Sequence, residues 1–361
     1  MYIRHLKTRG YRNLKEVNLS LPKAGVFALY GQNGAGKTNF LEALSMLSPG
    51  QGLYRDKLEN MMAFGYQQWS VFAEVENLMG LHKLGMLYSK KKRHMRLDGE
   101  NITQQAELAK LGAVLWFTPE MDRLFAGSPT PRRRFFDRLV FSVNPQHAAN
   151  LSGYTRHIQN RSKLLKLPNP DAQWLDIEEQ KAAKFATKIV RDRFAYLENL
   201  QAYFESISLE LKGTVERTAQ TPEAEGEEAL EHLFITKFKE NRERDARFGG
   251  NSFGPHRMDL SGELLGVTSL ERASMGQHKK AMLLILFAAA QLQKHVSGQA
   301  PCLLLDEVAT HLDANARHIL YEQLVPLGGQ IWLTGTEKSY FNELQTARFI
   351  HMADGAPKPE F

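Results

Sequence analysis

The pattern of apolar and polar residues along the chain changes twice. Residues 1–21 alternate between the two kinds, and residues 69–103 alternate again around turn residues at 77–80, which predicts strands joined in antiparallel hairpins. In residues 118–245 the apolar positions recur every three or four residues, which predicts helices. After Gly249 alternation and short apolar runs return. The chain is therefore expected to be strand-rich, then helical, then mixed.

The helical region contains three segments with more specific patterns. Thr130 and Pro131 are typical of a helix N-cap and of the first helical position. An apolar seam with three- and four-residue spacing predicts a further bundle helix. The seam consists of Leu197, Leu200, Phe204, Ile207 and Leu211. Residues 213–229 are polar, acidic and interrupted by Pro and Gly, which favours a mobile surface loop.

Short apolar runs near both chain ends indicate one sheet. The runs in residues 26–30, 300–308 and 328–336 are typical of buried strands in a parallel sheet. An α/β nucleotide-binding domain with a mixed sheet, built from residues 1–117 and 250–361, explains their order along the chain. A mainly helical domain is then inserted at residues 118–249.

Composition narrows the class of protein without indicating one function. The chain has 361 residues, a formal net charge of +6 and an isoelectric point near 9.2, which favours anionic partners such as nucleic acid. Cys302 is the single cysteine, so intramolecular disulfides and Cys-based zinc sites are excluded. No window approaches the roughly 20 apolar residues of a membrane span, and the first residues lack the apolar run of a signal peptide. A soluble cytoplasmic protein without a membrane partner is expected.

Residues 31–38 read GQNGAGKT and match the phosphate-binding pattern G-x-x-x-x-G-K-[ST] in full. An apolar strand before the motif and a helix after it supply the context that it requires. Backbone N–H groups of the loop would surround phosphate oxygens, Lys37 would reach the outer phosphates, and Thr38 would offer its hydroxyl to Mg²⁺. The nucleotide-binding residues are then Gly31, Gln32, Asn33, Gly34, Ala35, Gly36, Lys37 and Thr38. The loop predicts a nucleoside triphosphate ligand.

Two acidic residues follow the apolar run CLLL. In doubly wound sheets the carboxyl end of such a strand lies beside the phosphate loop. Asp306 is therefore expected to hold Mg²⁺ together with Thr38. Glu307 is expected to be the catalytic base that orients and deprotonates the attacking water. This pair favours hydrolysis of the nucleotide over binding alone.

A second phosphate-binding pattern begins a helix far along the chain, in ASMGQHKKAMLLILF. A serine hydroxyl, a glycine backbone and a helix start can together hold a terminal phosphate, but only from the face opposite the phosphate loop. Ser274, Gly276 and Gln277 resemble the Ser-x-Gly-Gln signature of the ABC-type ATPases, and Asp313 resembles their D-loop. The resemblance implies that these residues complete the site of a partner subunit, so that two chains enclose two ATP molecules.

Three further stretches resemble the RecF family, SMC-like ABC-type ATPases that mediate bacterial recombination. These are IRHLKTRGYRNLKEVNLSL, FTPEMDRLFAGSPTPRRRFFDR and FGPHRMDLSGEL. The resemblance implies an ABC-type ATPase head with an inserted helical lobe and without long coiled coils. It also implies an ATP-dependent homodimer that binds double-stranded DNA near gaps and helps to load a recombinase with RecR and RecO. Weak, DNA-stimulated ATP hydrolysis would then be the switch that releases the DNA.

Two other functions are weighed against this one. A transporter-type ATPase subunit would pair with a membrane protein and carry a small helical subdomain, whereas the helical insertion here is large and basic at its start. An ATPase fused to a nuclease would need a further cluster of metal-binding acids, and the sequence shows none outside LLLDE.

Two positions of the ABC-type pattern have no clear counterpart. The histidine that often follows the last strand is replaced by LTGTEK, which offers Thr334, Thr336 and Glu337. The Q-loop glutamine has two candidates, Gln51 and the stretch at 118–120. Both roles are left unassigned.

The basic run SKKKRHMR, residues 89–96, is a candidate DNA contact. It is expected on an exposed strand, where alternation would send Lys90 and Lys92 to one face and Lys91 and Arg93 to the other. Such a run neutralises phosphates without reading base sequence. Double-stranded DNA is favoured, because no aromatic stacking platform for single strands is apparent in the sequence.

The run PRRRFFDR is a second basic candidate. It places Arg133, Arg134 and Arg138 off the apolar face of a predicted helix, with Asp137 partly neutralising them. These arginines could equally fasten two parts of the chain together or support the ATP site.

Overall fold

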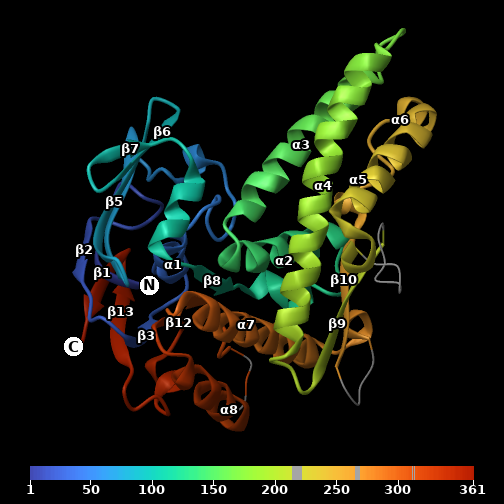
Figure 1. Cartoon of the computed structure of the whole chain (residues 1–361). Coiled ribbons are helices and arrows are strands. Elements are labelled where there is room, and N and C mark those ends of the chain that lie inside the picture. Colours follow the sequence, from blue (N-terminus) through green and yellow to red (C-terminus); the bar gives the residue numbers. More distant parts are fainter. Residues whose placement is uncertain (214–221, 265–268, 311, 313) are drawn as a thin grey trace. The chain divides into compact units, whose positions relative to one another are not determined.

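The chain folds into two compact units, described here from a computed structural model. The structure describes residues 1–213, 222–264, 269–310, 312 and 314–361. The first unit comprises Met1–Asp122 and Met282–Phe361, and the second comprises Arg123–Ala281. Both ends of the chain, blue to teal and orange to red in Figure 1, therefore build the first unit.

An antiparallel sheet of six strands forms one layer of the first unit, in the order β2-β1-β4-β5-β6-β7. Its strands are β1 (Tyr2–Arg9), β2 (Val17–Ser20), β4 (Gln68–Asn77), β5 (Gly80–Ser89), β6 (Lys92–Leu97) and β7 (Glu100–Ile102). Val71, Ala73 and Val75 of β4 are buried, and the residues between them are partly exposed. This period of two is the alternation that predicted the strands, and the predicted hairpins are confirmed.

A second sheet of six strands has the order β14-β13-β3-β12-β11-β8. Its strands are β3 (Gly25–Tyr30), β8 (Val114–Phe117), β11 (Cys302–Leu305), β12 (Gln330–Gly335), β13 (Arg348–Ala353) and β14 (Ala356–Pro359). All neighbours pair in parallel except β13 and β14. The residues of β8 and β11 are all buried, as expected for parallel strands covered on both faces. The predicted mixed sheet is confirmed.

Helix α1 (Lys37–Ser45) belongs to one continuous core with both sheets of the first unit. Its residues Phe40 and Leu44 are fully buried together with Leu6 of the antiparallel sheet and Trp332 of the mixed sheet. Phe40 also lies 5.5 Å, centroid to centroid, from the ring of Trp332. This packing holds the start of α1 at the carboxyl end of β3. Helix α8 (Ala314–Leu324) also lies wholly in this unit.

The second unit is mainly helical. Its elements are α2 (Pro129–Val143), α3 (Gln146–Leu164), α4 (Ala172–Gln201), β9 (Ile207–Lys212), α5 (Pro222–Glu240), α6 (Arg242–Phe248) and β10 (Asp259–Leu264). Helices α3 and α4 pack along each other as an antiparallel hairpin (Figure 1). Helix α7 (Met275–Ser297) begins in this unit and continues into the first. Within the described ranges, no helix has the length and apolarity needed to cross a membrane.

The helical seam predicted between Leu197 and Leu211 is wrong in its second half. Helix α4 ends at Gln201, and β9 follows, paired with β10 in an antiparallel ribbon. Its residues are alternately buried and exposed, a period of two that the chance three- and four-residue spacing concealed. The same pairing places residues 250–281 in the second unit, whereas the sequence pattern assigned them to the nucleotide domain.

Two further boundaries differ from the sequence predictions. Helix α2 begins at Pro129 after Ser128, rather than at Pro131, and Ser128 forms no side-chain cap. Of the loop predicted over residues 213–229, residues 214–221 lie outside the described part. From Pro222 onward the chain is helical, with a non-helical backbone at Gly226, where glycine tolerates a positive φ.

Candidate functional site

The phosphate loop connects β3 to α1 and owes its shape to its glycines. Gly31, Gly34 and Gly36 have φ values of 151°, 81° and 101°, which residues with a β-carbon rarely adopt. A β-carbon at Gly31 would also overlap the carbonyl oxygen of Met352 in β13. The loop therefore turns its backbone, not side chains, toward the start of α1, as a phosphate cradle requires.

Lys37 is folded back over the loop from the first residue of α1. It is 4% exposed, and its Nζ donates hydrogen bonds to the carbonyl oxygens of Gly31 (2.7 Å) and Gln32 (2.9 Å). Burial lowers the pKa of Lys37, and the negative charges of Glu307 and Asp306 partly oppose that shift. The ammonium group is thus held within the cradle, where phosphate oxygens could replace the two carbonyls.

Asp306 follows β11, and three hydroxyl groups donate hydrogen bonds to it. Its carboxylate is 2% exposed and accepts hydrogen bonds from Thr38 Oγ1 (3.0 and 3.1 Å), Thr334 Oγ1 (2.7 Å) and the Tyr54 hydroxyl (3.0 Å). Thr38 and Asp306, the two residues predicted to hold Mg²⁺, therefore lie side by side although 268 positions separate them. Hydroxyl and carboxylate oxygens are the ligands that Mg²⁺ prefers, so this pair fits the ion.

Glu307 lies directly after Asp306 in a constrained turn. Its φ of 49° is in the left-handed region, which is uncommon for a residue with a β-carbon and often marks a functional position. Its backbone N–H donates to Thr334 Oγ1 at 2.8 Å. Thr334, one of three candidates for the unassigned switch position, therefore bridges the backbone of Glu307 and the carboxylate of Asp306. Thr336 and Glu337 follow it at the end of β12 and are more exposed.

Tyr54 is a site residue that the sequence did not indicate. It lies in a turn after α1, and burial together with the charge of Asp306 raises its pKa, so it remains a hydrogen-bond donor. Of the two Q-loop candidates, Gln51 is exposed in the same turn, and residues 118–120 run from the end of β8 into a short 3-10 helix (Pro119–Arg123). No sequence motif marks Tyr54, since only the fold brings it to Asp306.

A buried ion pair braces the site. Arg12, in the turn after β1, donates from Nε and Nη2 to Glu42 of α1 (both 2.8 Å) and from Nη1 to Asp56 (2.9 Å). The Glu42 side chain is fully buried. Its hydrogen bonds with the guanidinium of Arg12 raise the pKa of Arg12. The amide of Asn13 donates to the carbonyl of Gly34 at 2.7 Å. These bonds tie α1, the phosphate loop and the Tyr54 segment together.

The signature residues begin α7 and cap it. The backbone N–H of Ser274 donates to Oε1 of Gln277 (2.8 Å), and the N–H of Gln277 donates to Oγ of Ser274 (3.4 Å). This is the reciprocal Ser-x-x-Gln capping box. A β-carbon at Gly276 would meet no atom within 4 Å, and Ser274 is exposed. Asp313, assigned to the D-loop, lies outside the described residues.

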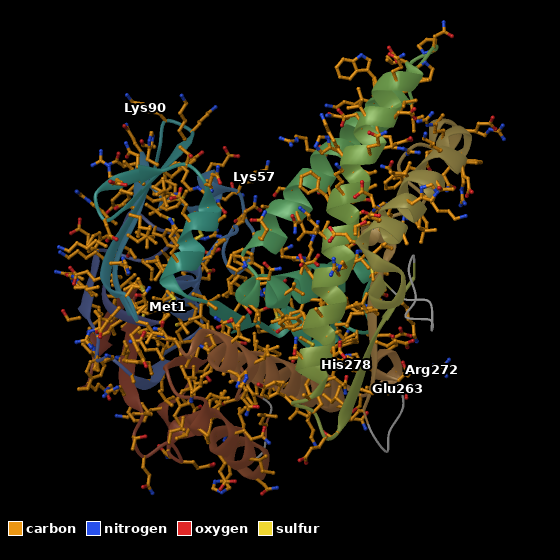
Figure 2. All side chains as sticks on the ribbon, in the orientation of Figure 1. Met1, Lys57, Lys90, Glu263, Arg272 and His278 are labelled. Carbon is orange, nitrogen blue, oxygen red and sulfur yellow. The ribbon has the colours of Figure 1, made fainter. Side chains whose placement is uncertain are left out.

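The basic run predicted as one exposed strand is a hairpin turn followed by a strand. Lys90 and Lys91, with φ of 49° and 60°, form the turn between β5 and β6, and Figure 2 shows Lys90 at its tip. Lys92 is exposed at the start of β6. Arg93 points to the other face, and burial lowers its pKa. Three adjacent lysines are therefore presented to solvent.

Arg133 and Arg138 of α2 contact other residues of the second unit. Arg133 donates to the carbonyl oxygen of Met258 and to Thr130 Oγ1, both at 3.0 Å, and Arg138 lies 5.4 Å from the ring centroid of Phe135. Asp137, expected to offset these arginines, instead pairs with Arg193. Of the three arginines, Arg134 is exposed and the other two are partly buried.

Comparison with known proteins connects this fold to one family. The model of the RecF/RecN/SMC N terminal domain matches residues 2–356. The DNA replication and repair proteins RecF of Rhizobium meliloti and Allorhizobium ampelinum are 35% and 36% identical over 371 and 370 residues, covering 98% of each chain.

Solved structures agree on the fold. A recombination mediator protein RecF, described as RecF-ATPrS in the RecFOR pathway, superposes with a TM-score of 0.88 at 23% identity over 100% of this chain and 98% of its own. An Smc head bound to the C-winged helix domain of ScpA reaches a TM-score of 0.54 at 15% identity over 99% of this chain and 97% of its own. The ABC-type ATPase head predicted from the sequence is confirmed. The chain belongs to the RecF family.

Proposed function

We propose that this chain is an ATP-dependent, DNA-binding clamp of recombinational DNA repair, in which slow ATP hydrolysis is a release switch. The observation that carries the proposal is the convergence of Thr38 and Asp306 beside the phosphate loop, 3.0 Å apart, with Glu307 next in sequence. The names of the relatives, DNA replication and repair protein RecF, support the role in repair.

The phosphate loop would bind ATP and the Thr38–Asp306 pair would hold Mg²⁺. Lys37 would exchange its hydrogen bonds to the carbonyls of Gly31 and Gln32 for bonds to the outer phosphates. The Mg²⁺ ion, when bound, would neutralise charge on the β- and γ-phosphate oxygens. Thr334 and Tyr54 would keep the carboxylate of Asp306 in one orientation, because each occupies one of its oxygens.

Glu307 would act as the catalytic base. Its carboxylate would accept a proton from the attacking water, a step that contributes about 10²- to 10⁴-fold to a rate when the group is well placed. The bond from its N–H to Thr334 holds its backbone against the same hydroxyl that orients Asp306. Base and metal ligand are thus positioned by one residue.

ATP would also join two chains. Ser274, Gly276 and Gln277 of one chain would bind the γ-phosphate held by Lys37 of the other, and Asp313 would lie at the same interface. A nucleotide that contacts both subunits stabilises the dimer by the free energy of those added contacts. Hydrolysis removes the shared phosphate, so it would separate the chains.

The dimer would bind duplex DNA near gaps and cooperate with RecR and RecO to load a recombinase. The exposed Lys90, Lys91 and Lys92 support phosphate contacts, which give salt-dependent affinity without base specificity. The description of a solved RecF structure as part of the RecFOR pathway supports these partners.

Light scattering after gel filtration, with and without ATP and duplex DNA, tests this function. We expect a monomer without nucleotide, a dimer with ATP, and co-elution of the duplex with the dimer. Lys37→Ala should remain a monomer, whereas Lys57→Ala, at an exposed position marked in Figure 2, should dimerise like the wild type. A wild-type chain that binds ATP and stays monomeric would contradict the proposal.

A further inference from the structure

The α3–α4 hairpin of the second unit exposes most of its basic residues and turns three of its acidic residues inward, between the two helices. Residues 146–195 contain nine Lys and Arg and five Asp and Glu. Seven of those cations are exposed. Among the carboxylates, Asp171 is exposed, the Asp176 side chain is 40% exposed, and Glu198, further along α4, is exposed as well. Exposed cations therefore outnumber exposed carboxylates on this hairpin.

Buried ion pairs between the two helices cause this segregation. Three carboxylates of α4 face α3, and each pairs there with a cationic or imidazole side chain. The pairs are Glu178 with His157 (2.7 Å), Glu179 with Arg161 (2.8 Å) and Asp192 with His147 (2.8 Å). These three carboxylates are hydrogen-bonded to side chains of α3, so none of them pairs with the lysines on the outer surface of the hairpin.

Four of the exposed cations form a single row along α4. Lys181, Lys184, Lys188 and Arg191 are separated by three, four and three residues, which places them on one helical face, and all four are exposed. Arg191 pairs with Glu227 of α5 at 2.5 Å. In the part of the chain that the structure describes, no carboxylate pairs with the three lysines. We call this row the α4 lysine stripe.

We infer that the α4 lysine stripe contacts the phosphate backbone of duplex DNA, an inference that rests on the proposed DNA-binding function. The three unpaired lysines of the row extend for about 10 Å, given a rise of 1.5 Å per residue. The same length of duplex axis carries about six phosphate charges. A straight row of ammonium groups on a rigid helix matches such a rod-shaped polyanion, and it lies in a different unit from Lys90, Lys91 and Lys92.

The composition of the stripe favours nucleic acid over an acidic protein. Lysine is depleted in the cores of protein–protein interfaces, which depend on aromatic, Met and Arg anchors. The row continues toward the start of α4 through Ile177 and Trp174, which are 39% and 57% exposed, but from Lys181 to Arg191 its exposed side chains are all cationic. Lysines act on phosphates as point charges and do not read bases. The stripe should therefore increase affinity for any duplex sequence.

Charge reversal of the stripe tests the inference. The variant K181E/K184E/K188E keeps good helix formers at all three exposed positions, so α4 should persist. The matched control K57E/K110E/K358E makes the same charge change at exposed lysines of the first unit. Affinity for a short labelled duplex is measured with ATP between about 50 and 200 mM salt. We expect the slope of log affinity against log salt to fall by about 2 to 3 in the stripe variant, and by much less in the control.

The outcomes separate this inference from the proposed function. A wild-type chain that binds no duplex at low salt would overturn the proposed function itself. If the wild type binds duplex DNA and the stripe variant has the same salt slope as the control, the inference alone is wrong. The expected partner of the stripe is then an acidic protein. ATP-dependent dimerisation of the stripe variant, measured by light scattering, shows that a lost slope does not come from misfolding.

Discussion

The hydroxyl of Tyr54 donates a hydrogen bond of 3.0 Å to Oδ2 of Asp306, across 252 positions of sequence. Thr38 donates to the same oxygen at 3.0 Å. Asp306 is therefore oriented by a residue outside every motif of the family pattern. Removing a group that holds a metal ligand in place typically lowers metal affinity by about 10- to 100-fold.

Tyr54→Phe should lower the affinity of the site for Mg²⁺. Without the hydroxyl the Asp306 carboxylate loses one of its three donors, so we expect the Mg²⁺ concentration for half-maximal ATP hydrolysis to rise about tenfold. The affinity for fluorescently labelled ATP, measured without Mg²⁺, should be unchanged. Tyr66→Phe, at an exposed tyrosine of the same unit, is the control. Identical Mg²⁺ curves for the two variants would remove Tyr54 from this role.

Glu307→Gln should nearly abolish turnover while leaving ATP binding intact. The amide cannot accept a proton from water, so hydrolysis should fall by about 10²- to 10⁴-fold in single-turnover measurements. The ATP-bound dimer should then stay on DNA, which gel filtration with labelled duplex detects. Glu100→Gln, at an exposed glutamate of β7, should hydrolyse ATP normally. Unchanged turnover in the Glu307 variant would assign the base to another residue.

Gln277→Glu should separate the two roles of the signature. A glutamate at this position still forms a capping box with Ser274, so the thermal unfolding midpoint should change little. Its negative charge would repel a γ-phosphate, and ATP-dependent dimerisation should be lost. Ser274→Arg should block the dimer as well, with ATP binding to the monomer preserved. Equal loss of ATP binding and dimerisation would mean that the site is not shared between chains.

His147 should make the stability of the second unit depend on pH. Burial lowers its pKa, but hydrogen bonds with Asp137 and Asp192 outweigh burial and raise it above the ordinary value. A raised folded-state pKa stabilises the fold fully below the unfolded value of about 6.5, and this contribution is lost as the pH rises through the folded value. The pKa of Asp137 is lowered to about 2, so its contribution is lost only as the pH falls toward that value.

Urea unfolding between pH 5 and 9 measures this effect, with all values at about the same ionic strength. The difference in unfolding free energy between the wild type and His147→Gln should shrink as the pH rises. His94→Gln, at an exposed histidine of β6, should show no such trend. A difference that stays constant across the range would mean that His147 does not titrate in the folded chain.

Local patterns determined much of this protein. The spacing GQNGAGKT specifies a phosphate loop because its glycines must adopt particular backbone angles, and the run CLLLDE specifies a buried strand with acids at its end. The alternation in residues 69–103 specified the hairpins, because a strand has a period of two. Where two periods coincided by chance, as at Phe204 and Ile207, local reasoning chose a helix and missed β9, whose partner β10 lies 47 residues further along the chain.

Only the tertiary structure decided the relationships that depend on distant residues. Tyr54 became a neighbour of Asp306 because packing of α1 between two sheets places the turn after it against the end of β11. The three lysines of the α4 lysine stripe are left without carboxylate partners because Glu178, Glu179 and Asp192 turn inward to α3. Composition counts charges wherever they lie, whereas the field that a partner meets depends on which charges the fold buries in pairs.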